Sequence, residues 1–323
     1  LPKLQPIAER GRGVQHEAKI ALLRRARRDF DDPRVTAEPS WVHFFGNCTY
    51  GGKKTKAWIS EAEERKILSS IALVETHVPA GPKKKSFNRS AKKGGLVACH
   101  SLATPTGKGK GTSGGAVALV RPETEVRLSP PSWAPKQAKF SGDDWIALMV
   151  RMTKQNVLII NAYFHPGTDH LTQNNNTFNQ ILKLKRLLNL PTVLLADFNA
   201  TAKELEERGW PNLFGGFIAQ PDVEFTCNSA GSKRIIDFAL ITFDLIGQCQ
   251  LVPSFEVPWG PHIGLELLLY GNIEDAVGWQ GRSPNPLPDL PKLKREAQER
   301  IVLEDGTRAE EFTPWTEAAA SWG

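Results

Sequence analysis

Residues 193–199 read Val-Leu-Leu-Ala-Asp-Phe-Asn, a short apolar run that ends at an acid and an amide. Residues 72–77 read Ala-Leu-Val-Glu-Thr-His and follow the same pattern. Apolar runs of this length, bounded by polar or turn-forming residues, are typical of buried strands. Side chains at the ends of strands can converge on one cleft, and a buried acid there needs a metal ion or a charged partner. Both stretches therefore predict strands that end at a polar site.

Similar apolar runs recur through the middle of the 323-residue chain. Strands are predicted over residues 41–45, 71–74, 115–120, 145–152, 157–163, 193–196, 235–241 and 263–270, because these runs are short and rich in β-branched residues. Helices are predicted over residues 54–70 and 177–190, the second with its apolar residues on one face. We therefore expect one mixed α/β domain over residues 41–270, with sheets covered by helices.

The segments on either side of this range are polar. Residues 1–40 predict a short helix and a linker, and residues 271–323 predict a proline-rich linker followed by a disordered tail. The chain begins with Leu rather than Met, which indicates a fragment, and its first residues contain no apolar secretory segment. No apolar run is long enough to span a membrane, and four scattered cysteines favour a reducing compartment. We expect an intracellular protein that is not secreted, and the nucleus is a compatible location.

The positive charge is concentrated in one segment. The chain has 41 basic and 35 acidic residues, a net charge of +6, and 40% apolar residues, which excludes disorder throughout. Residues 81–115, the basic segment, contain no acid and eight basic residues: Lys83, Lys84, Lys85, Arg89, Lys92, Lys93, Lys108 and Lys110. The rest of the chain is slightly acidic. Such a segment attracts polyanions such as nucleic acid, and a solvated loop is the alternative on charge alone.

Polar residues of a particular kind lie at the ends of the predicted strands. Each has a simple structural explanation when taken alone, such as a helix cap, a turn or ordinary packing. Together they comprise three carboxylates, two amides, a phenol and an imidazole: Glu75, Asp197, Asp237, Asn47, Asn199, Tyr163 and His262. These groups are the ones that metal-assisted hydrolysis of a phosphodiester requires.

The types of these residues and their order along the chain resemble the motifs of the endonuclease/exonuclease/phosphatase superfamily. That superfamily includes DNase I, the abasic-site endonucleases and the endonuclease domains of LINE-type retrotransposons. The resemblance covers about residues 41–270, and its most specific parts are Asp-Phe-Asn at 197–199 and Val-Glu-Thr-His at 74–77. The segment at 114–119 also resembles the family's Gly-Gly-containing strand. It implies a DNase I-like fold: a four-layer αββα sandwich of two mixed, mainly antiparallel β-sheets flanked by helices.

The resemblance also implies a divalent metal ion, Mg²⁺, with Mn²⁺ as the alternative. A phosphodiester is anionic and repels hydroxide, so a cation must neutralise charge at the phosphorus. Mg²⁺ prefers hard oxygen ligands and keeps several waters, so one or two carboxylates suffice. By the resemblance, Glu75 would be the principal metal ligand, with Asn47 beside it.

The remaining residues receive catalytic roles from the same resemblance. Asp197 would orient or deprotonate the attacking water, and Asn199 would bind a phosphate oxygen or the nucleophile. Tyr163 would contact the phosphate or assist the leaving group. Asp237 and His262 would form a carboxylate–imidazole pair, in which the ring is either a charged phosphate-binding group or a neutral base.

Two positions depart from the family pattern. The family usually has Ser-Asp-His at its end, whereas residues 260–262 read Gly-Pro-His, so Pro261 replaces an acid. Thr49 stands where the abasic-site branch often carries Asp. The principal metal ligand and the Asp–His pair are present, so weakened catalysis is expected, and an inactive copy is the alternative.

The sequence as a whole predicts a Mg²⁺-dependent DNA endonuclease of retrotransposon type. The basic segment would contact the DNA backbone, and the protein would act as a monomer that was once joined to a reverse transcriptase in a longer parent protein. Two alternatives are a degenerate domain that binds nucleic acid without cutting it and a phosphoesterase of the same fold that is not a nuclease. Cleavage of DNA and its loss on substitution of Glu75 or Asp197 separate these hypotheses.

Overall fold

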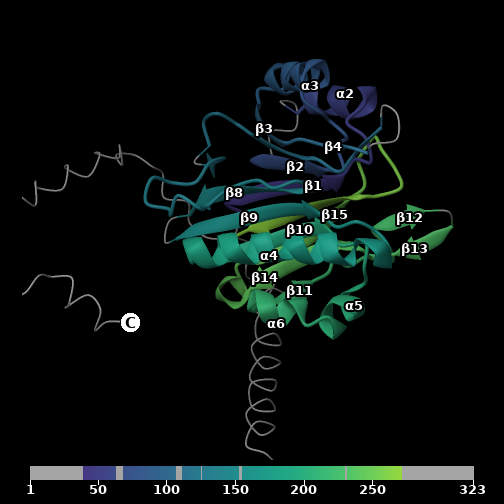
Figure 1. Cartoon of the computed structure of the whole chain (residues 1–323). Coiled ribbons are helices and arrows are strands. Elements are labelled where there is room, and N and C mark those ends of the chain that lie inside the picture. The colour runs from purple at the N-terminus through teal and green to yellow at the C-terminus, as the bar shows by residue number, and fades with distance from the viewer. Residues whose placement is uncertain are drawn as a thin grey trace, which may run out of the picture. The chain divides into compact units, whose positions relative to one another are not determined.

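The computed structural model describes residues 39–270, apart from residues 63–67, 107–110, 125, 153–154 and 230. Two six-stranded sheets lie face to face within these residues (Figure 1). The helix and linker predicted for residues 1–40, except the last two residues, and the linker and tail predicted for residues 271–323 lie outside the described part. None of the described helices is both long and apolar enough to cross a membrane.

The first sheet brings together strands from both ends of the domain. Its order is β15 (Cys249–Ser254), β16 (Gly264–Leu269), β1 (Trp41–Asn47), β2 (Ser70–Val74), β6 (Ala116–Val120) and β3 (Val97–Ser101). The pair β1–β2 is parallel, and the other pairs are antiparallel. Asn47 is opposite Val74 at the end of the parallel pair, so Asn47 and Glu75 leave the sheet at the same edge.

The second sheet aligns three of the predicted site residues. Its order is β11 (Gly216–Ala219), β14 (Asp237–Thr242), β10 (Thr192–Asp197), β9 (Asn156–Tyr163), β8 (Trp145–Arg151) and β7 (Val126–Arg127). Strands β9 and β10 are parallel, and Asp197 is opposite Tyr163. Strands β10 and β14 are antiparallel, and Asp197 is opposite Asp237. The register therefore places the three residues in one row across the sheet.

Helices cover the outer face of each sheet, so the molecule has four layers (Figure 1). On the first sheet lie α2 (Lys53–Ser60) and α3 (Pro82–Lys93), which pack through Trp58, Ile59 and Phe87. On the second lie α4 (Leu171–Leu188), α5 (Ala202–Glu207) and α6 (Trp210–Phe214). A third apolar cluster, with Phe45 from one sheet and Leu148 from the other, fills the space between the sheets. The predicted αββα sandwich is confirmed.

Short elements complete the described residues. Two small ribbons pair β12 (Cys227–Ser229) with β13 (Ser232–Arg234) and β4 (Thr104–Pro105) with β5 (Thr112–Ser113). Two short 3-10 turns, η1 (Thr168–His170) and η2 (Phe243–Leu245), precede α4 and β15. The turn η1 leads directly into α4 and so brings residues 165–173 to the edge of the sheet where β9 ends.

The structure corrects the bounds of two predicted helices and decides between a helix and a loop in the basic segment. Helix α2 ends at Ser60 rather than at residue 70, because the chain must turn back and begin β2 at Ser70. Helix α4 begins six residues earlier than predicted. Residues 82–93 of the basic segment form a helix rather than a solvated loop. Pro82 stands in its first turn, and Phe87 and Ala91, four residues apart, pack against the sheet.

Candidate active site

The predicted site residues converge at one edge of the two sheets, where four strands end and two begin. Asn47 ends β1, Tyr163 ends β9, Asp197 ends β10, and Asp237 begins β14, which runs in the opposite direction. Glu75 directly follows β2, and His262 precedes β16. The parallel pairs in each sheet place these termini on the same edge. The site thus draws on both sheets.

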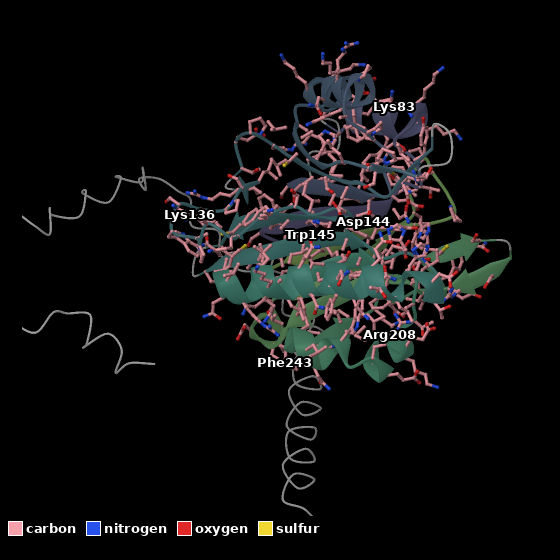
Figure 2. The ribbon with its side chains drawn as sticks, in the orientation of Figure 1. Lys83, Lys136, Asp144, Trp145, Arg208 and Phe243 are labelled. Carbon is pink, nitrogen blue, oxygen red and sulfur yellow. The ribbon has the colours of Figure 1, made fainter. Side chains whose placement is uncertain are left out.

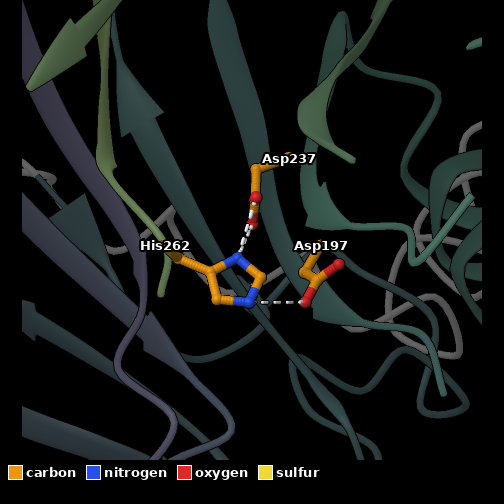
Figure 3. A group of neighbouring side chains, drawn as sticks. All are labelled: Asp197, Asp237 and His262. Carbon is orange, nitrogen blue, oxygen red and sulfur yellow. Dashed lines mark hydrogen bonds and ion pairs between the residues drawn. The ribbon is translucent and has the colours of Figure 1, made fainter. Parts of the chain in front are cut away.

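Two acids surround the imidazole of His262, as Figure 3 shows. Its Nδ1 donates to Asp237 Oδ2 at 2.9 Å, and its Nε2 lies 3.8 Å from Asp197 Oδ2. Asp237 and Asp197 are buried, and the His262 residue is 8% exposed. Thr226 anchors this corner, because its carbonyl oxygen accepts from the Ile263 N–H at 2.9 Å. The imidazole is therefore fixed between two carboxylates.

Burial and charge act in opposite directions on His262. Burial alone would lower the pKa of the imidazole, but the carboxylates of Asp237, Asp197 and Glu75 raise it to about 9. Burial and the nearby charge of Asp237 raise the pKa of Asp197 above its ordinary value, although His262 and Asn47 oppose the shift. The site therefore favours a protonated imidazole next to a carboxylate that takes up protons readily.

Asn47 connects the acids of the two sheets. Its Nδ2 donates to Asp197 Oδ2 at 2.8 Å, and its side chain also forms a hydrogen bond with Glu75. Its Oδ1 accepts the backbone N–H of Thr49 at 2.8 Å. The amide thus contacts the carboxylate that follows β2 and the one at the end of β10, and its oxygen accepts a hydrogen bond from the loop after β1. In this structure Asn47 orients both acids.

Glu75 has a partner that the sequence-based site did not include. Its Oε1 lies 3.7 Å from His77 Nε2, and the ring Nδ1 of His77 donates to the carbonyl oxygen of Thr112. Burial alone would raise the pKa of Glu75, but hydrogen bonds from His77 and Asn47 lower it below its usual value. The bond with Glu75 raises the pKa of His77. The motif Val-Glu-Thr-His contained this partner, but the sequence did not indicate that the chain adopts a left-handed conformation at both residues, with φ near +53° and +51°.

Tyr163 and Asn199 differ in what their side chains contact. Tyr163 is buried and hydrogen-bonded to Glu75, and burial together with the charges of Glu75 and Asp197 raises its pKa well above the ordinary value. The amide of Asn199 donates from Nδ2 to the carbonyl oxygen of Phe164 at 2.8 Å, and its backbone N–H donates to Asp197 Oδ1 at 2.9 Å. Tyr163 therefore lies among the acids, whereas the Asn199 amide supports the loop that follows Asp197.

Two groups of residues offer oxygen or nitrogen atoms to a metal ion. Asp197, Asp237 and His262 have ligand atoms within 4.8 Å of one another. A metal-bound histidine must be neutral, however, whereas the surrounding carboxylates raise the pKa of His262 to about 9. Glu75 has a lowered pKa and a partly exposed carboxylate, so it is ionised and accessible. The chemistry of the donors therefore fits a hard cation at Glu75 better than one between the two acids and His262.

The basic residues on α3 extend away from this edge. Lys83, Lys85, Arg89, Lys92 and Lys93 are exposed, Lys84 is half-buried, and Lys108 and Lys110 lie outside the described residues. The Nζ of Lys83, at the beginning of α3, is 5.8 Å from the centre of the Tyr50 ring, and its charge lowers the pKa of His77 (Figure 2). The N-terminal end of α3 is thus the end nearest Glu75 and His77.

A second basic helix, not singled out from the sequence, lies beside α3. Helix α2 carries Lys53, Lys54 and Lys56, and the Lys56 Nζ donates to Ser86 Oγ of α3 at 3.1 Å. We call these two helices the basic helix pair. No local pattern in the sequence indicated it, because Lys53 and Gly81 are 28 positions apart and the pairing of β1 with β2 brings the two helices together.

Solved structures with similar folds include nucleases. The endonuclease domain of TRAS1, a telomere-specific non-LTR retrotransposon, is 14% identical, with a TM-score of 0.52 over 71% of this chain and 98% of that chain. The AP endonuclease LMAP from Leishmania major is 10% identical, with a TM-score of 0.53 over 71% of this chain and 87% of that chain. An endonuclease/exonuclease/phosphatase family protein from Leptotrichia buccalis is 14% identical, with a TM-score of 0.51 over 71% of this chain and 99% of that chain.

Comparison of the sequence alone gives no relative. No family model matches the chain, and no curated protein matches it. The likeness is therefore one of fold, carried by the two facing sheets and their flanking helices. The resemblance inferred from the strand-end residues is confirmed at this level, and the chain has the fold of the endonuclease/exonuclease/phosphatase proteins.

Proposed function

We propose that this chain is a Mg²⁺-dependent phosphodiesterase that cuts DNA as an endonuclease of retrotransposon type. One observation carries the proposal: Asn47 joins Glu75 to Asp197, and His262 joins Asp197 to Asp237. Three acids, an amide and an imidazole thus form one connected group at the edge of the two sheets. Burying so much negative charge is costly unless a cation or an anionic substrate with its cation completes the site.

The donor set fits a hard divalent cation. Glu75 would bind it, Asn47 would orient Glu75, and Mn²⁺ could replace Mg²⁺ because both accept oxygen ligands. When bound, the ion neutralises charge on the phosphate and polarises its oxygens. The role of Asn47 as a ligand itself, through Oδ1, stays a prediction, since that oxygen accepts from Thr49.

The residues around Asp197 account for proton movement and phosphate binding. His262, with a pKa near 9, is protonated at neutral pH and binds an oxygen of the scissile phosphate through its Nε2–H. Asp197 accepts the proton of the attacking water. Tyr163 donates from its hydroxyl to the phosphate. Asn199 keeps the loop after Asp197 in place.

The basic helix pair supports a nucleic-acid substrate. Lysine and arginine side chains on α2 and α3 begin beside the site and continue along the outer face of the first sheet. Cationic groups in such an arrangement bind a phosphate backbone without reading its sequence. The fold shared with the TRAS1 endonuclease domain favours DNA as the substrate and a retrotransposon as the origin of the chain. We extend the proposal to a monomer that acts in the nucleus and belonged to a longer protein with a reverse transcriptase.

A degenerate domain that binds nucleic acid without cutting it is the second candidate. It is favoured by two positions, Thr49 and Pro261, which lack the carboxylates that the resemblance implies. Under this alternative the basic helix pair would still bind DNA in a salt-dependent way. The acids of the site would then be remnants without a catalytic role.

Nicking of supercoiled plasmid in the presence of Mg²⁺ tests the proposal. The wild-type chain is expected to nick, and Glu75→Gln and Asp197→Asn are expected to lower the rate by about a hundredfold or more, because each removes a group required in the transition state. The variant Lys203→Gln, on the exposed surface of α5, serves as a control for preparation. A wild-type chain that binds DNA without nicking it supports the degenerate domain, and equal nicking by all variants indicates a contaminating nuclease.

A further inference from the structure

A second carboxylate–imidazole pair lies beside the site. The Nε2 of His165 donates to Asp144 Oδ2 at 2.9 Å, the same length as the bond between His262 and Asp237. Asp144 is only 4% exposed. The proposed chemistry uses neither residue, so a nearly buried acid and its imidazole partner remain without an assigned role.

The surrounding backbone holds this pair in one place. The carbonyl oxygen of Asp144 accepts the N–H of Tyr163 at 2.9 Å. Asn174 of α4 accepts the N–H of His165 at 2.9 Å and donates to its carbonyl oxygen at 2.8 Å. The side-chain Nε2 of Gln173 lies 3.2 Å from Asp144 Oδ2 and 2.8 Å from His165 Nε2, so this amide contacts both members of the pair. Strand β8, strand β9 and the first turn of α4 thus all fix the pair, and Asp144 is labelled near the centre of Figure 2.

The imidazole of His165 stands between Tyr163 and the surface. Its ring centre is 5.0 Å from that of Tyr163, edge to face, and 5.0 Å from that of His170 on the other side. His170 and Gln173 are exposed, and His170 Nδ1 lies 3.3 Å from Gln173 Oε1. We call His165, His170 and Gln173 the histidine rim. The histidine rim therefore runs from His165, beside the proposed phosphate contact Tyr163, to the exposed side chains of His170 and Gln173.

We infer that the histidine rim binds the phosphate next to the scissile one in a polynucleotide, an inference that rests on the proposed function. Imidazole N–H groups donate readily to phosphate oxygens. Asp144 accepts from Nε2 of His165, so Nδ1 is the nitrogen left for a ligand, and it donates to a phosphate oxygen when the ring carries both protons. Tyr163 separates the rim from Glu75, and a second phosphate on the same strand would therefore meet the rim when the first lies among the acids.

A second phosphate site restricts the substrate to molecules with at least two neighbouring phosphates. A site with a place for a neighbouring phosphate favours a chain of phosphodiesters over a phosphomonoester or an isolated diester. A substitution in the histidine rim should therefore lower kcat/KM for an oligonucleotide more than kcat/KM for a diester with a single phosphate. Loss of one charge-assisted contact corresponds to roughly tenfold.

Two substrates and three variants test the inference. A short oligothymidylate and bis(p-nitrophenyl) phosphate are compared with Mg²⁺ for the wild-type chain, His165→Gln and His170→Gln. The ratio of kcat/KM for the oligonucleotide to that for the small diester should fall about tenfold in both variants. The matched control His100→Gln removes a histidine that is bonded to Asn88 on α3, and its ratio should equal that of the wild type. Thermal melting checks that each variant is folded.

Each outcome decides the question. An unchanged ratio in the rim variants overturns the inference, and so does an equal loss on both substrates, which would mean that His165 only supports Tyr163. If the wild type hydrolyses neither substrate, the proposed function fails, and the rim is then tested by fluorescence anisotropy with labelled oligothymidylate in EDTA. A Kd raised about tenfold in His165→Gln and not in His100→Gln supports a phosphate site, whereas equal Kd values overturn it.

Discussion

The hydroxyl of Thr49 lies 3.4 Å from the carbonyl oxygen of Gly260 and joins the loop after β1 to the segment that carries His262. Thr49 and Pro261 are the two positions at which the family resemblance implies an acid. The contact makes them neighbours in the fold, although more than two hundred residues separate them in the sequence. Both missing carboxylates therefore belong to one corner of the site, next to Asn47. The loss of negative charge is local, because the three connected acids, Glu75, Asp197 and Asp237, are all present.

Restoring charge at position 49 is expected to increase cleavage. Thr49 is exposed and has φ near +52°, a conformation that Asp adopts more easily than Thr. Thr49→Asp should raise the rate of plasmid nicking about tenfold at limiting Mg²⁺, because a further carboxylate strengthens binding of the cation. The control Thr49→Asn has the same shape without the charge. Equal rates for the two variants would show that backbone conformation, not charge, limits the site.

Position 261 gives an independent test of the same corner. Pro261→Asp should raise cleavage if the site is intact but short of one acid. The carbonyl oxygen of residue 261 accepts the N–H of Asn228 at 3.1 Å, a bond that any residue there can form. Pro261→Asn is the neutral control. No gain from Pro261→Asp, together with DNA binding that weakens steeply with salt, would support the degenerate binding domain instead.

The strand-end pattern allowed much of the fold to be predicted, because an apolar run and the residue after it are both local. Asp197 and Glu75 were predicted at the ends of strands, and the structure places them there. Helix α3 was missed for a physical reason: most of its residues are charged or polar, and only Phe87 and Ala91 are buried. Its stability comes from packing on the sheet, which no local pattern shows.

The histidine rim could not be predicted, because its partners meet only in the folded chain. Asp144 and His165 are 21 residues apart; Asp144 directly precedes β8, and His165 follows β9, the strand paired with β8. The spacing of His165 and His170 matches no metal motif, so the sequence offered no reason to group them. The bridging role of Asn47 is similar, since it depends on the approach of the two sheets.

The two ends of α3 should contribute unequally to DNA binding. Lys83 and Lys85 lie at the end near Glu75, and Lys92 and Lys93 lie at the other end of a helix about 18 Å long. The double variant Lys83→Glu/Lys85→Glu should weaken binding of duplex DNA in EDTA and reduce the slope of log K against log salt by about 2. Lys92→Glu/Lys93→Glu changes the net charge equally and is the matched control. Equal effects would mean that only total charge matters.

The pKa of His262 predicts how stability depends on pH. It is about 9 in the folded chain, against an ordinary value of 6.5, so the folded state binds more protons between these values. The stabilisation is fully present below pH 6.5 and is lost as pH rises through 9. The pKa of Asp197 is also raised, and it acts in the same direction. Denaturant unfolding in EDTA should show stability falling from pH 7 to pH 9.5, and NMR titration should show the imidazole titrating near 9.

Removing the partner of His262 tests the cause of this shift. Asp237→Asn replaces the carboxylate that accepts from Nδ1 and should lower the pKa of His262, since burial alone lowers it. The NMR titration of the imidazole measures the change directly. A pKa that stays near 9 in Asp237→Asn would mean that Asp197 and Glu75 are sufficient to keep the ring charged.

Gly114 lies between the Glu75–His77 pair and the Asp144–His165 pair and should tolerate no side chain. It has φ near +67°, and its carbonyl oxygen accepts the N–H of His77 at 3.0 Å. A Cβ at this position would lie 1.8 Å from Asp144 Oδ1, so Gly114→Ala must displace the acid that holds His165. Gly247→Ala is the matched control, because Gly247 has φ near +76° and nothing within 4 Å of a Cβ among the residues that the structure describes.

The difference between the two glycine variants isolates the steric contact from the cost of a left-handed backbone. Both should lose about 1 kcal/mol of unfolding free energy from the positive φ, and Gly114→Ala should lose roughly 1–3 kcal/mol more from the overlap with Asp144. Denaturant titration measures both values. Gly114→Ala should also reduce oligonucleotide binding in EDTA as His165→Gln does, because displaced Asp144 no longer orients the ring. Equal stability of the two variants would show that the Asp144 side chain moves aside freely, and the histidine rim would then not depend on its carboxylate.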